Sequence, residues 1–180
     1  MSTGPTADVS VRLAWPDDVE AIARLQVAAW QESFADVLGD QLDAVRPHDL
    51  ADRWRQMLAA PRDARQRVLV ALERATVRGF ALVHPCHDED ADPVADGEIG
   101  EFVVGAAHRG QGHGSRLLQA CADTLSADRF TRAVWWLGST DDATRAFATA
   151  AGWAPDGAHR ELAAETGDAL KQVRLHTGLA

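Results

Sequence analysis

The stretch from Gly97 to Leu125 reads GEIGEFVVGAAHRGQGHGSRLLQACADTL and decides the fold. Its first part, residues 98–104, is short and rich in β-forming residues, which predicts a buried strand. Its last part, residues 114–125, carries apolar side chains at helical spacing, which predicts an amphipathic helix with Leu117, Leu118, Cys121, Ala122 and Leu125 on one face. Between strand and helix lies a turn with three glycines, Arg109-Gly110-Gln111-Gly112-His113-Gly114.

A glycine-rich turn between a strand and a helix is suited to binding an anion. The first amide groups of a helix lack partners within the helix, and the peptide dipoles favour negative charge there. Glycines let a phosphate approach the backbone because no Cβ stands in its way. The alternative for these six residues is a glycine-rich helix entry without a ligand.

Spacing separates the kinds of phosphate site. A dinucleotide fold uses G-x-G-x-x-G, whereas this turn reads G-x-G-x-G, and the turn lacks the lysine of a nucleoside-triphosphate loop. The turn does match R-x-x-G-x-G through Arg109, Gly112 and Gly114. In this respect the sequence resembles the GCN5-related N-acetyltransferase (GNAT) family, in which this turn holds the pyrophosphate of acetyl-coenzyme A (acetyl-CoA). The resemblance spans about residues 9–175.

The other expected elements complete an alternation of strands and helices. Strands are predicted at residues 9–14, 66–73, 76–84, 98–104 and 132–138, with two more within 160–175, and helices at 15–30, 48–59, 114–125 and 143–151. Their order, β-α-α-β-β-β-α-β-α-β-β, predicts an α/β (α+β) fold with a mixed, mainly antiparallel central sheet flanked by helices on both faces. This is the acyl-CoA N-acyltransferase (GNAT) architecture that the resemblance implies. We expect residues 1–7 to form a flexible tail and residues 8–178 a single domain.

Composition argues against several classes of protein. The net charge of -9 disfavours nucleic acid as a partner, since phosphate binding needs clustered basic residues. No apolar run approaches the ~20 residues of a membrane span, and residues 1–7 lack the apolar core of a signal peptide. The two cysteines follow no metal or redox spacing, and neither do the histidines and carboxylates of residues 84–96. We therefore expect a cytoplasmic protein that binds neither nucleic acid, membrane nor metal, and a homodimer is compatible with the sequence.

Two glutamates on the central strand, Glu98 and Glu101, are the candidates for deprotonating an amine. Residues three apart face opposite sides of a regular strand, but a bulge at Gly100 would bring both carboxylates to one side. Two neighbouring carboxylates would raise the pKa of at least one of them toward neutral pH. The resemblance supports this interpretation, since some family members carry the general base at the Glu98 position. The alternative is that one glutamate is exposed and the other pairs with an arginine.

The resemblance also implies which residues contact the coenzyme. Backbone groups of Phe102, Val103 and Val104 are expected to bind the pantetheine arm, and the backbone of Arg109, Gly110, Gln111, Gly112, His113 and Gly114 the pyrophosphate. Residues 141–153 resemble the family helix N-x-x-A-x-x-F-Y-x-x-x-G-F, which places Asp141 and Phe147 beside the coenzyme. Two departures stand out: Asp141 occupies the asparagine position, and Ala148 that of the tyrosine commonly proposed to protonate the leaving thiolate. The chain has no tyrosine at all.

The acceptor site is less well defined by the sequence. Trp30, Phe34 and Trp54 are expected to form an apolar wall beside it. The function predicted is transfer of the acetyl group of acetyl-CoA to a primary amine of a small molecule or peptide by direct attack. The alternatives are a non-enzymatic acyl-CoA-binding or regulatory module with a degenerate site, and a transferase of longer acyl groups. Without a tyrosine, the thiolate is expected to take its proton from water near Ala148, with Cys121 or His113 as alternative acids.

Overall fold

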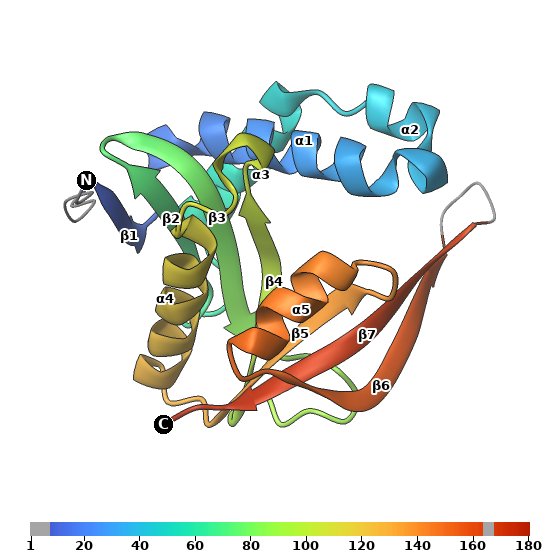
Figure 1. Ribbon diagram of the computed structural model, residues 1–180. Helices are drawn as coiled ribbons and strands as arrows, with labels where there is room; N and C mark the ends of the chain where they lie inside the picture. Colours follow the sequence, from blue (N-terminus) through green and yellow to red (C-terminus); the bar gives the residue numbers. More distant parts are fainter. Residues whose placement is uncertain (1–7, 164–167) are drawn as a thin grey trace, which may run out of the picture.

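The computed structural model describes residues 8–163 and 168–180, so the tail predicted at residues 1–7 lies outside the described residues. The elements follow the predicted order (Figure 1): β1 (Val9–Leu13), the 3-10 helix η1 (Pro16–Asp18), α1 (Val19–Leu38), α2 (Asp40–Asp43), α3 (Pro47–Ala59), β2 (Arg67–Glu73), β3 (Thr76–Pro85), β4 (Asp96–Val104), the 3-10 helix η2 (Ala106–His108), α4 (His113–Ala127), β5 (Arg132–Gly138), α5 (Asp142–Ala150), β6 (Ala154–Ala163) and β7 (Ala169–Gly178).

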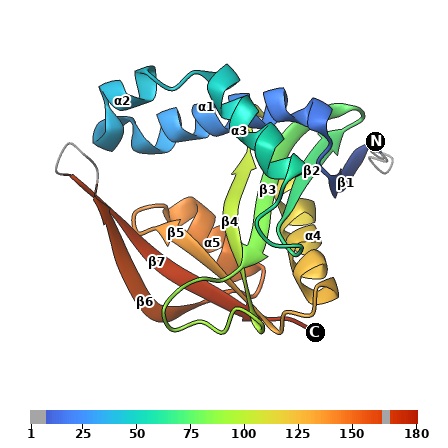
Figure 2. The same ribbon diagram turned by 180° about the vertical axis from the view of Figure 1, so that it is seen from behind.

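The strands form one mixed sheet in the order β1-β2-β3-β4-β5-β7-β6. The pair β4–β5 is parallel, and the other neighbouring pairs are antiparallel. Helices α1 and α3 cover one face of the sheet, and α4 and α5 cover the other, as the front and back views show (Figures 1 and 2). The predicted fold class, a mainly antiparallel sheet with helices on both faces, is confirmed.

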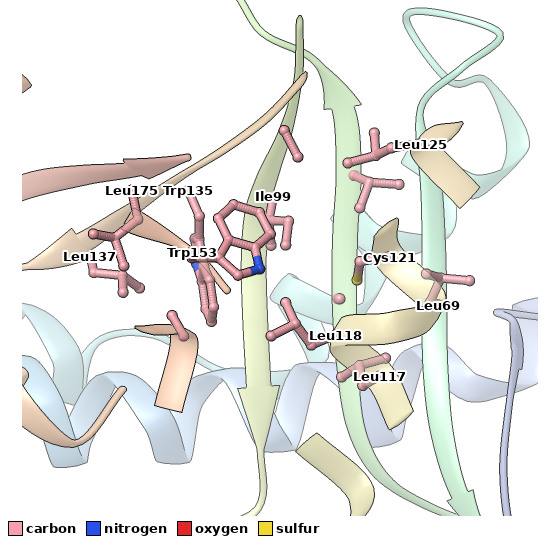
Figure 3. Close-up of a cluster of buried hydrophobic side chains, with 14 of the residues drawn as sticks. Leu69, Ile99, Leu117, Leu118, Cys121, Leu125, Trp135, Leu137, Trp153 and Leu175 are labelled. Atoms are coloured by element: carbon pink, nitrogen blue, oxygen red, sulfur yellow. The ribbon is translucent and has the colours of Figure 1, made fainter. Parts of the chain in front are cut away.

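Each face of the sheet has its own apolar core. On the α4 side, side chains from the sheet, α4 and the segment after α5 pack together (Figure 3), among them Leu69, Ile99, Leu117, Leu118, Cys121, Leu125, Trp135, Leu137, Trp153 and Leu175. On the other side, α1 and α3 pack on β2 and β3 through Ile22, Leu50, Trp54, Val70 and Phe80. Burial on both faces explains why β2 is a continuous apolar run rather than an alternating one.

Strands β4 and β5 separate halfway along their length. Their parallel ladder ends at the pair Ile99 and Trp135, whereas the ladder of β4 with β3 continues to the pair Val104 and Gly79. Figure 1 shows the two strands diverging beyond that point. The second half of β4 therefore borders β5 without pairing to it.

Some boundaries differ from the sequence predictions. Strand β6 begins at Ala154 rather than near Arg160, and the short helix α2 was not predicted. Pro155 and Gly157, with φ of 88° at Gly157, resemble a loop in the sequence, but a register shift between Pro155 and His159 accommodates them within the strand. Within residues 8–163 and 168–180, no helix is both long and apolar enough to cross a membrane.

Candidate functional site

A bulge at Gly100 brings Glu98 and Glu101 to the same face of β4. In the ladder with β3, Glu101 pairs with Leu82 and Ile99 pairs with Val83, so Gly100 is the extra residue. A Cβ at Gly100 would lie 2.5 Å from Nε2 of His84, which explains the glycine. Because Ile99 and Phe102 pack on the α4 side, both carboxylates face the side of α1. The predicted bulge is confirmed.

Glu101 lines a cleft, and its side chain is half-buried. Burial raises the pKa of its carboxyl to about 7, and a hydrogen bond from the Gln26 side chain opposes this rise. The sequence analysis predicted that repulsion between the two carboxylates raises a pKa. For Glu101 this is wrong, because burial raises its pKa and Glu98 is not among the causes. Its pKa is nevertheless near the value best suited to a general base at neutral pH.

Glu98 has a different environment from Glu101. Burial is also the main cause that raises its pKa, and His84, Asp88 and the Cys86 thiol are its neighbours. Ligand atoms of Cys86, Asp88 and Glu98 lie within 4.8 Å of one another, which is close enough to share a metal ion. However, the Asp88 Oδ2 atom already accepts hydrogen bonds from Trp136 and Arg174, each at 2.9 Å. Glu98 lines neither of the two clefts described next.

The first cleft has a volume of about 610 Å³ and contains Glu101. It is called the acceptor cleft after the role that the sequence predicts for this region. Its walls come from α1, α2, β4, β5, α5, β6 and β7, and they include Trp30 and Phe34 of α1. Trp54 does not line this cleft. Its side chain is only 3% exposed and packs edge-on against Phe80, with ring centroids 5.4 Å apart. Trp54 was predicted to line the acceptor site, but α3 packs its apolar face onto the sheet and so buries Trp54 in the core.

The second cleft has a volume of about 440 Å³ and lies between β4, α1, α4 and α5. It is called the coenzyme cleft after the role that the sequence predicts for this region. Eight of the residues predicted to contact a coenzyme line it: Phe102, Val103, Val104, Arg109, Gly110, Gly114, Asp141 and Phe147. Gln111, Gly112 and His113 do not. Gly112 has a left-handed φ of 89° at the N-cap of α4, and no atom lies within 4 Å of the position of a Cβ there. The backbone of the turn is therefore open to an approaching phosphate.

His113 points away from the coenzyme cleft into the protein. Its side chain is 0% exposed, and neither ring nitrogen has a hydrogen-bond partner among the described residues. Burial lowers the pKa of the imidazole, which favours the neutral ring. The side chain therefore contacts neither solvent nor a phosphate, although its backbone amide still belongs to the first turn of α4.

The two clefts meet. They share six lining residues: Ala29, Ser33, Phe102, Val103, Asp141 and Thr144. Ser33 of α1 and Thr144 of α5 supply hydroxyl groups at this junction, and the sequence analysis did not single them out. Asp141 accepts a hydrogen bond from the backbone N–H of Thr144 at 3.1 Å, so its carboxylate caps α5.

None of the residues that the sequence analysis linked to protonation of the leaving thiolate lines either cleft. Ala148 is fully buried in the core on the α4 side, together with Cys121, and lines neither cleft. Burial raises the pKa of the Cys121 thiol well above its usual value. The packed core therefore replaces the water-filled gap expected beside Ala148, and neither Cys121 nor His113 is placed to protonate a leaving group. The helix instead directs Thr144 and Phe147 toward the clefts.

Comparison with known proteins places these features in context. The sequence model of the acetyltransferase (GNAT) family matches residues 21–153. The uncharacterized N-acetyltransferase YuaI of Bacillus subtilis (strain 168) is 25% identical over 130 residues, which is 72% of this chain and 71% of YuaI.

Solved structures have the same fold. The structure of yncA from Salmonella typhimurium, with its cofactor acetyl-CoA, superimposes with a TM-score of 0.74 at 20% identity and covers 97% of this chain and 95% of that one. A phosphinothricin acetyltransferase from Sinorhizobium meliloti in complex with acetyl-CoA gives a TM-score of 0.73 at 19% identity, covering 96% and 89%.

Proposed function

The chain belongs to the acetyltransferase (GNAT) family, and from this membership and the two joined clefts we propose how it moves an acetyl group from acetyl-CoA to an amine. The observation that carries the proposal is the junction of the clefts. The coenzyme cleft leads from the glycine turn along β4 to six residues that also line the acceptor cleft, where Glu101 lies. A thioester and an amine in the two clefts would meet there.

The residues of the coenzyme cleft fit acetyl-CoA. Beyond Ile99, β4 does not pair with β5, which leaves this edge to offer backbone groups of Phe102, Val103 and Val104 to the amides of a pantetheine arm. The Val104 carbonyl already accepts a hydrogen bond from Nε of Arg109 at 3.2 Å, so the arm would compete with Arg109 there. The open backbone at Gly110 and Gly112, at the N-terminus of α4, suits a pyrophosphate. Phe147 supplies an apolar wall. Two proteins of the same fold were solved with acetyl-CoA, which supports a coenzyme role for this cleft.

Glu101 is the general base in this proposal. Its carboxylate takes one proton from the ammonium form of the acceptor, and the neutral amine then attacks the thioester carbonyl. The attack forms the C–N bond, and collapse of the tetrahedral intermediate breaks the C–S bond and releases the coenzyme thiolate. The nitrogen still carries one proton too many for an amide, and this proton passes through water to the thiolate. Glu98, which the sequence analysis also put forward, lies farther along the same face but outside both clefts, and we assign it a supporting electrostatic role.

The thiolate leaves without a titrating acid. The described residues that line the clefts include neither cysteine nor histidine, and the chain has no tyrosine. A thiolate with a pKa near 8.5 is a tolerable leaving group. The hydroxyls of Ser33 and Thr144 are placed to donate hydrogen bonds at the junction.

The acceptor is a primary amine of a small molecule or a peptide. The volume of the acceptor cleft is typical of small-molecule sites, and Trp30 and Phe34 give it apolar walls. We also propose that the protein works in the cytoplasm without a metal, since both described cysteines are buried free thiols.

The test is an assay of coenzyme thiol release with a panel of primary amines, with mass spectrometry of the products. Acetyl-CoA should give amine-dependent thiol release and an acetylated product. Binding of acetyl-CoA without turnover on any amine would favour the non-enzymatic binding module instead. Faster turnover with a longer acyl-CoA would favour the second alternative, a transferase of longer acyl groups.

A further inference from the structure

Arg160 of β6 is the one cation among the described residues that line the acceptor cleft. The acids in the same lining are Glu101 and Asp141. The Arg160 side chain is 36% exposed, so a charged group in the cleft can reach it. The sequence analysis did not single it out, and the proposed function gives it no role. A partly exposed guanidinium in the wall of a substrate cleft is suited to binding a negative group of the substrate.

Two contacts with other cleft residues hold the Arg160 guanidinium in place. Its Nε–H donates a hydrogen bond to Oε1 of Gln172 on β7 at 2.7 Å. Its Cζ atom lies 4.3 Å from the ring centroid of Trp136 on β5, so the guanidinium stacks over the indole. Both Gln172 and Trp136 also line the acceptor cleft. The guanidinium is therefore oriented at the cleft wall before any ligand binds.

The terminal nitrogens of this guanidinium are available to a ligand. They donate no hydrogen bond to a described residue, and the carboxylate beside them, that of Asp88, has its Oδ1 atom 3.9 Å from Nη1. The other oxygen of Asp88, Oδ2, already accepts hydrogen bonds from Trp136 and Arg174. Arg174 is the neighbouring cation, but it is only 4% exposed and is bonded to three aspartates. Arg160 is thus the accessible cation of the pair.

The stacked guanidinium lies across the split in the sheet from Glu101. Trp135 is the last residue of β5 that pairs with β4, and Trp136 is the next. Because the two strands run parallel, Trp136 is level with the bulge that precedes Glu101. Trp135 packs in the core on the α4 side, so Trp136 faces the α1 side, as Glu101 does. Glu101 and Arg160 therefore present opposite charges to one cleft.

We propose that the acceptor is an amino acid or a related small molecule with a primary amine and a carboxylate, and that Arg160 binds this carboxylate. The inference rests on the proposed function and deepens it, since it names the class of acceptor. Attraction of the ammonium group to Glu101 and of the carboxylate to Arg160 sets the direction in which the molecule binds. A reversed molecule would bring its carboxylate against Glu101 and Asp141. The fork of a guanidinium matches the two oxygens of a carboxylate.

Substrate pairs that differ in one charge test the proposal. The panel contains the common α-amino acids and unbranched ω-amino acids with one to five methylene groups, each with its carboxamide, together with unbranched alkylamines. Arg160→Gln removes the charge, and Arg160→Lys keeps the charge without the fork. Lys171→Gln is the matched control, because it removes a cation from β7 beside Gln172 that lines neither cleft. Thermal unfolding identifies a variant that does not fold, and the remaining Arg160 variant then serves alone.

The readout is the ratio of kcat/KM for an amino acid to kcat/KM for its carboxamide, measured by coenzyme thiol release. Comparing this ratio between proteins cancels the difference in amine pKa between the two compounds. The wild type should prefer the amino acid, and Arg160→Gln should lower the ratio about 10- to 100-fold, because a hydrogen-bonded charge pair is lost. The loss should lie mainly in KM, since this contact is the same before and during the reaction. Arg160→Lys should give an intermediate ratio, and Lys171→Gln the wild-type ratio.

Two results would overturn the proposal: a wild-type preference for carboxamides or alkylamines, or an unchanged ratio in Arg160→Gln. If the wild type acetylates no amine at all, the proposed function is contradicted, and calorimetric titration of the protein saturated with coenzyme A decides about the carboxylate separately. In that titration, amino acids should bind the wild type more tightly than their carboxamides do, and Arg160→Gln should lose the difference. Equal binding of both compounds to the wild type, or binding of neither, would also overturn the proposal.

Discussion

Arg109 and Glu32 form a bidentate ion pair in the wall of the coenzyme cleft. The two terminal nitrogens of the Arg109 guanidinium each donate a hydrogen bond to a carboxylate oxygen of Glu32 at 2.7 Å. The Arg109 guanidinium holds the pKa of Glu32 below its usual value. The arginine of the glycine turn is thus neutralised by α1, and a pyrophosphate at this turn would have to compete with a carboxylate.

Glu32→Gln should therefore strengthen the binding of acetyl-CoA. Because the pair is about half exposed, the expected gain is only about two- to fivefold in Kd at low ionic strength and less at high salt. Calorimetric titration of the variant measures this, with Asp36→Asn on the same helix as the control. Weaker binding by Glu32→Gln would show instead that the carboxylate serves to position Arg109.

Gly112→Asp should weaken acetyl-CoA binding by ~3 kcal/mol or more, because it adds a side chain and a negative charge where the pyrophosphate is proposed to lie. Gly152 is a matched control. It also has a left-handed φ, and a Cβ there would have no atom within 4 Å, but it follows α5 and is not at the N-terminus of α4. Gly152→Asp should carry the same backbone strain and leave the Kd unchanged. Equal Kd values in both variants and the wild type would remove the turn from the coenzyme site.

The pH profile of kcat should show one ionisation. Burial places the pKa of Glu101 at about 7, so kcat should rise as this carboxyl loses its proton and then remain level to about pH 10. No falling limb is expected, since Cys121 and His113 are buried away from the clefts. A bell-shaped profile would reveal a titrating acid and contradict unaided departure of the thiolate.

Buried His113 should make the fold less stable in mild acid. Because burial lowers its pKa in the folded state, the unfolded chain takes up a proton that the folded chain does not as pH falls below about 6.5. His113 therefore does not reduce the free energy of unfolding above that pH, and it reduces it increasingly as the pH falls below that value. His113→Phe should remove this loss, so its free energy of unfolding should drop less between pH 7 and pH 5 than that of the wild type. Urea unfolding at both pH values tests this, with the exposed His159→Gln as control, and an equal drop would contradict it.

Local patterns predicted most of the fold. Strand β5, the turn before α4 and the bulge at Gly100 each follow from a few neighbouring residues, because periodicity and glycine placement act over short distances. Strand β6 escaped full prediction because Pro155 and Gly157 resemble a loop, and only the pairing with β7 makes them part of a strand.

The arrangement of the site was harder to predict, because it depends on contacts between residues that are far apart in the sequence. The buried hydrogen bond between Trp54 and Gln26 arises because α3 and α1 meet on one face of the sheet, and no local pattern marks it. Trp54 and Ala148 were misplaced for the same reason, since which face of a helix meets the core is settled by the whole packing arrangement. Burial raises the pKa of Glu101, whereas the sequence suggested repulsion between two carboxylates.

The most direct test of Glu101 as the base compares Glu101→Gln with Glu98→Gln in steady-state acetyl transfer, with the Kd of acetyl-CoA measured in both. Glu101→Gln should lower kcat by ~10²-fold or more at pH 8, because the amine then has no base, while its Kd stays at the wild-type value. Glu98→Gln, outside both clefts, should have the smaller effect on kcat. Full kcat in Glu101→Gln, or a loss confined to Glu98→Gln, would contradict the account.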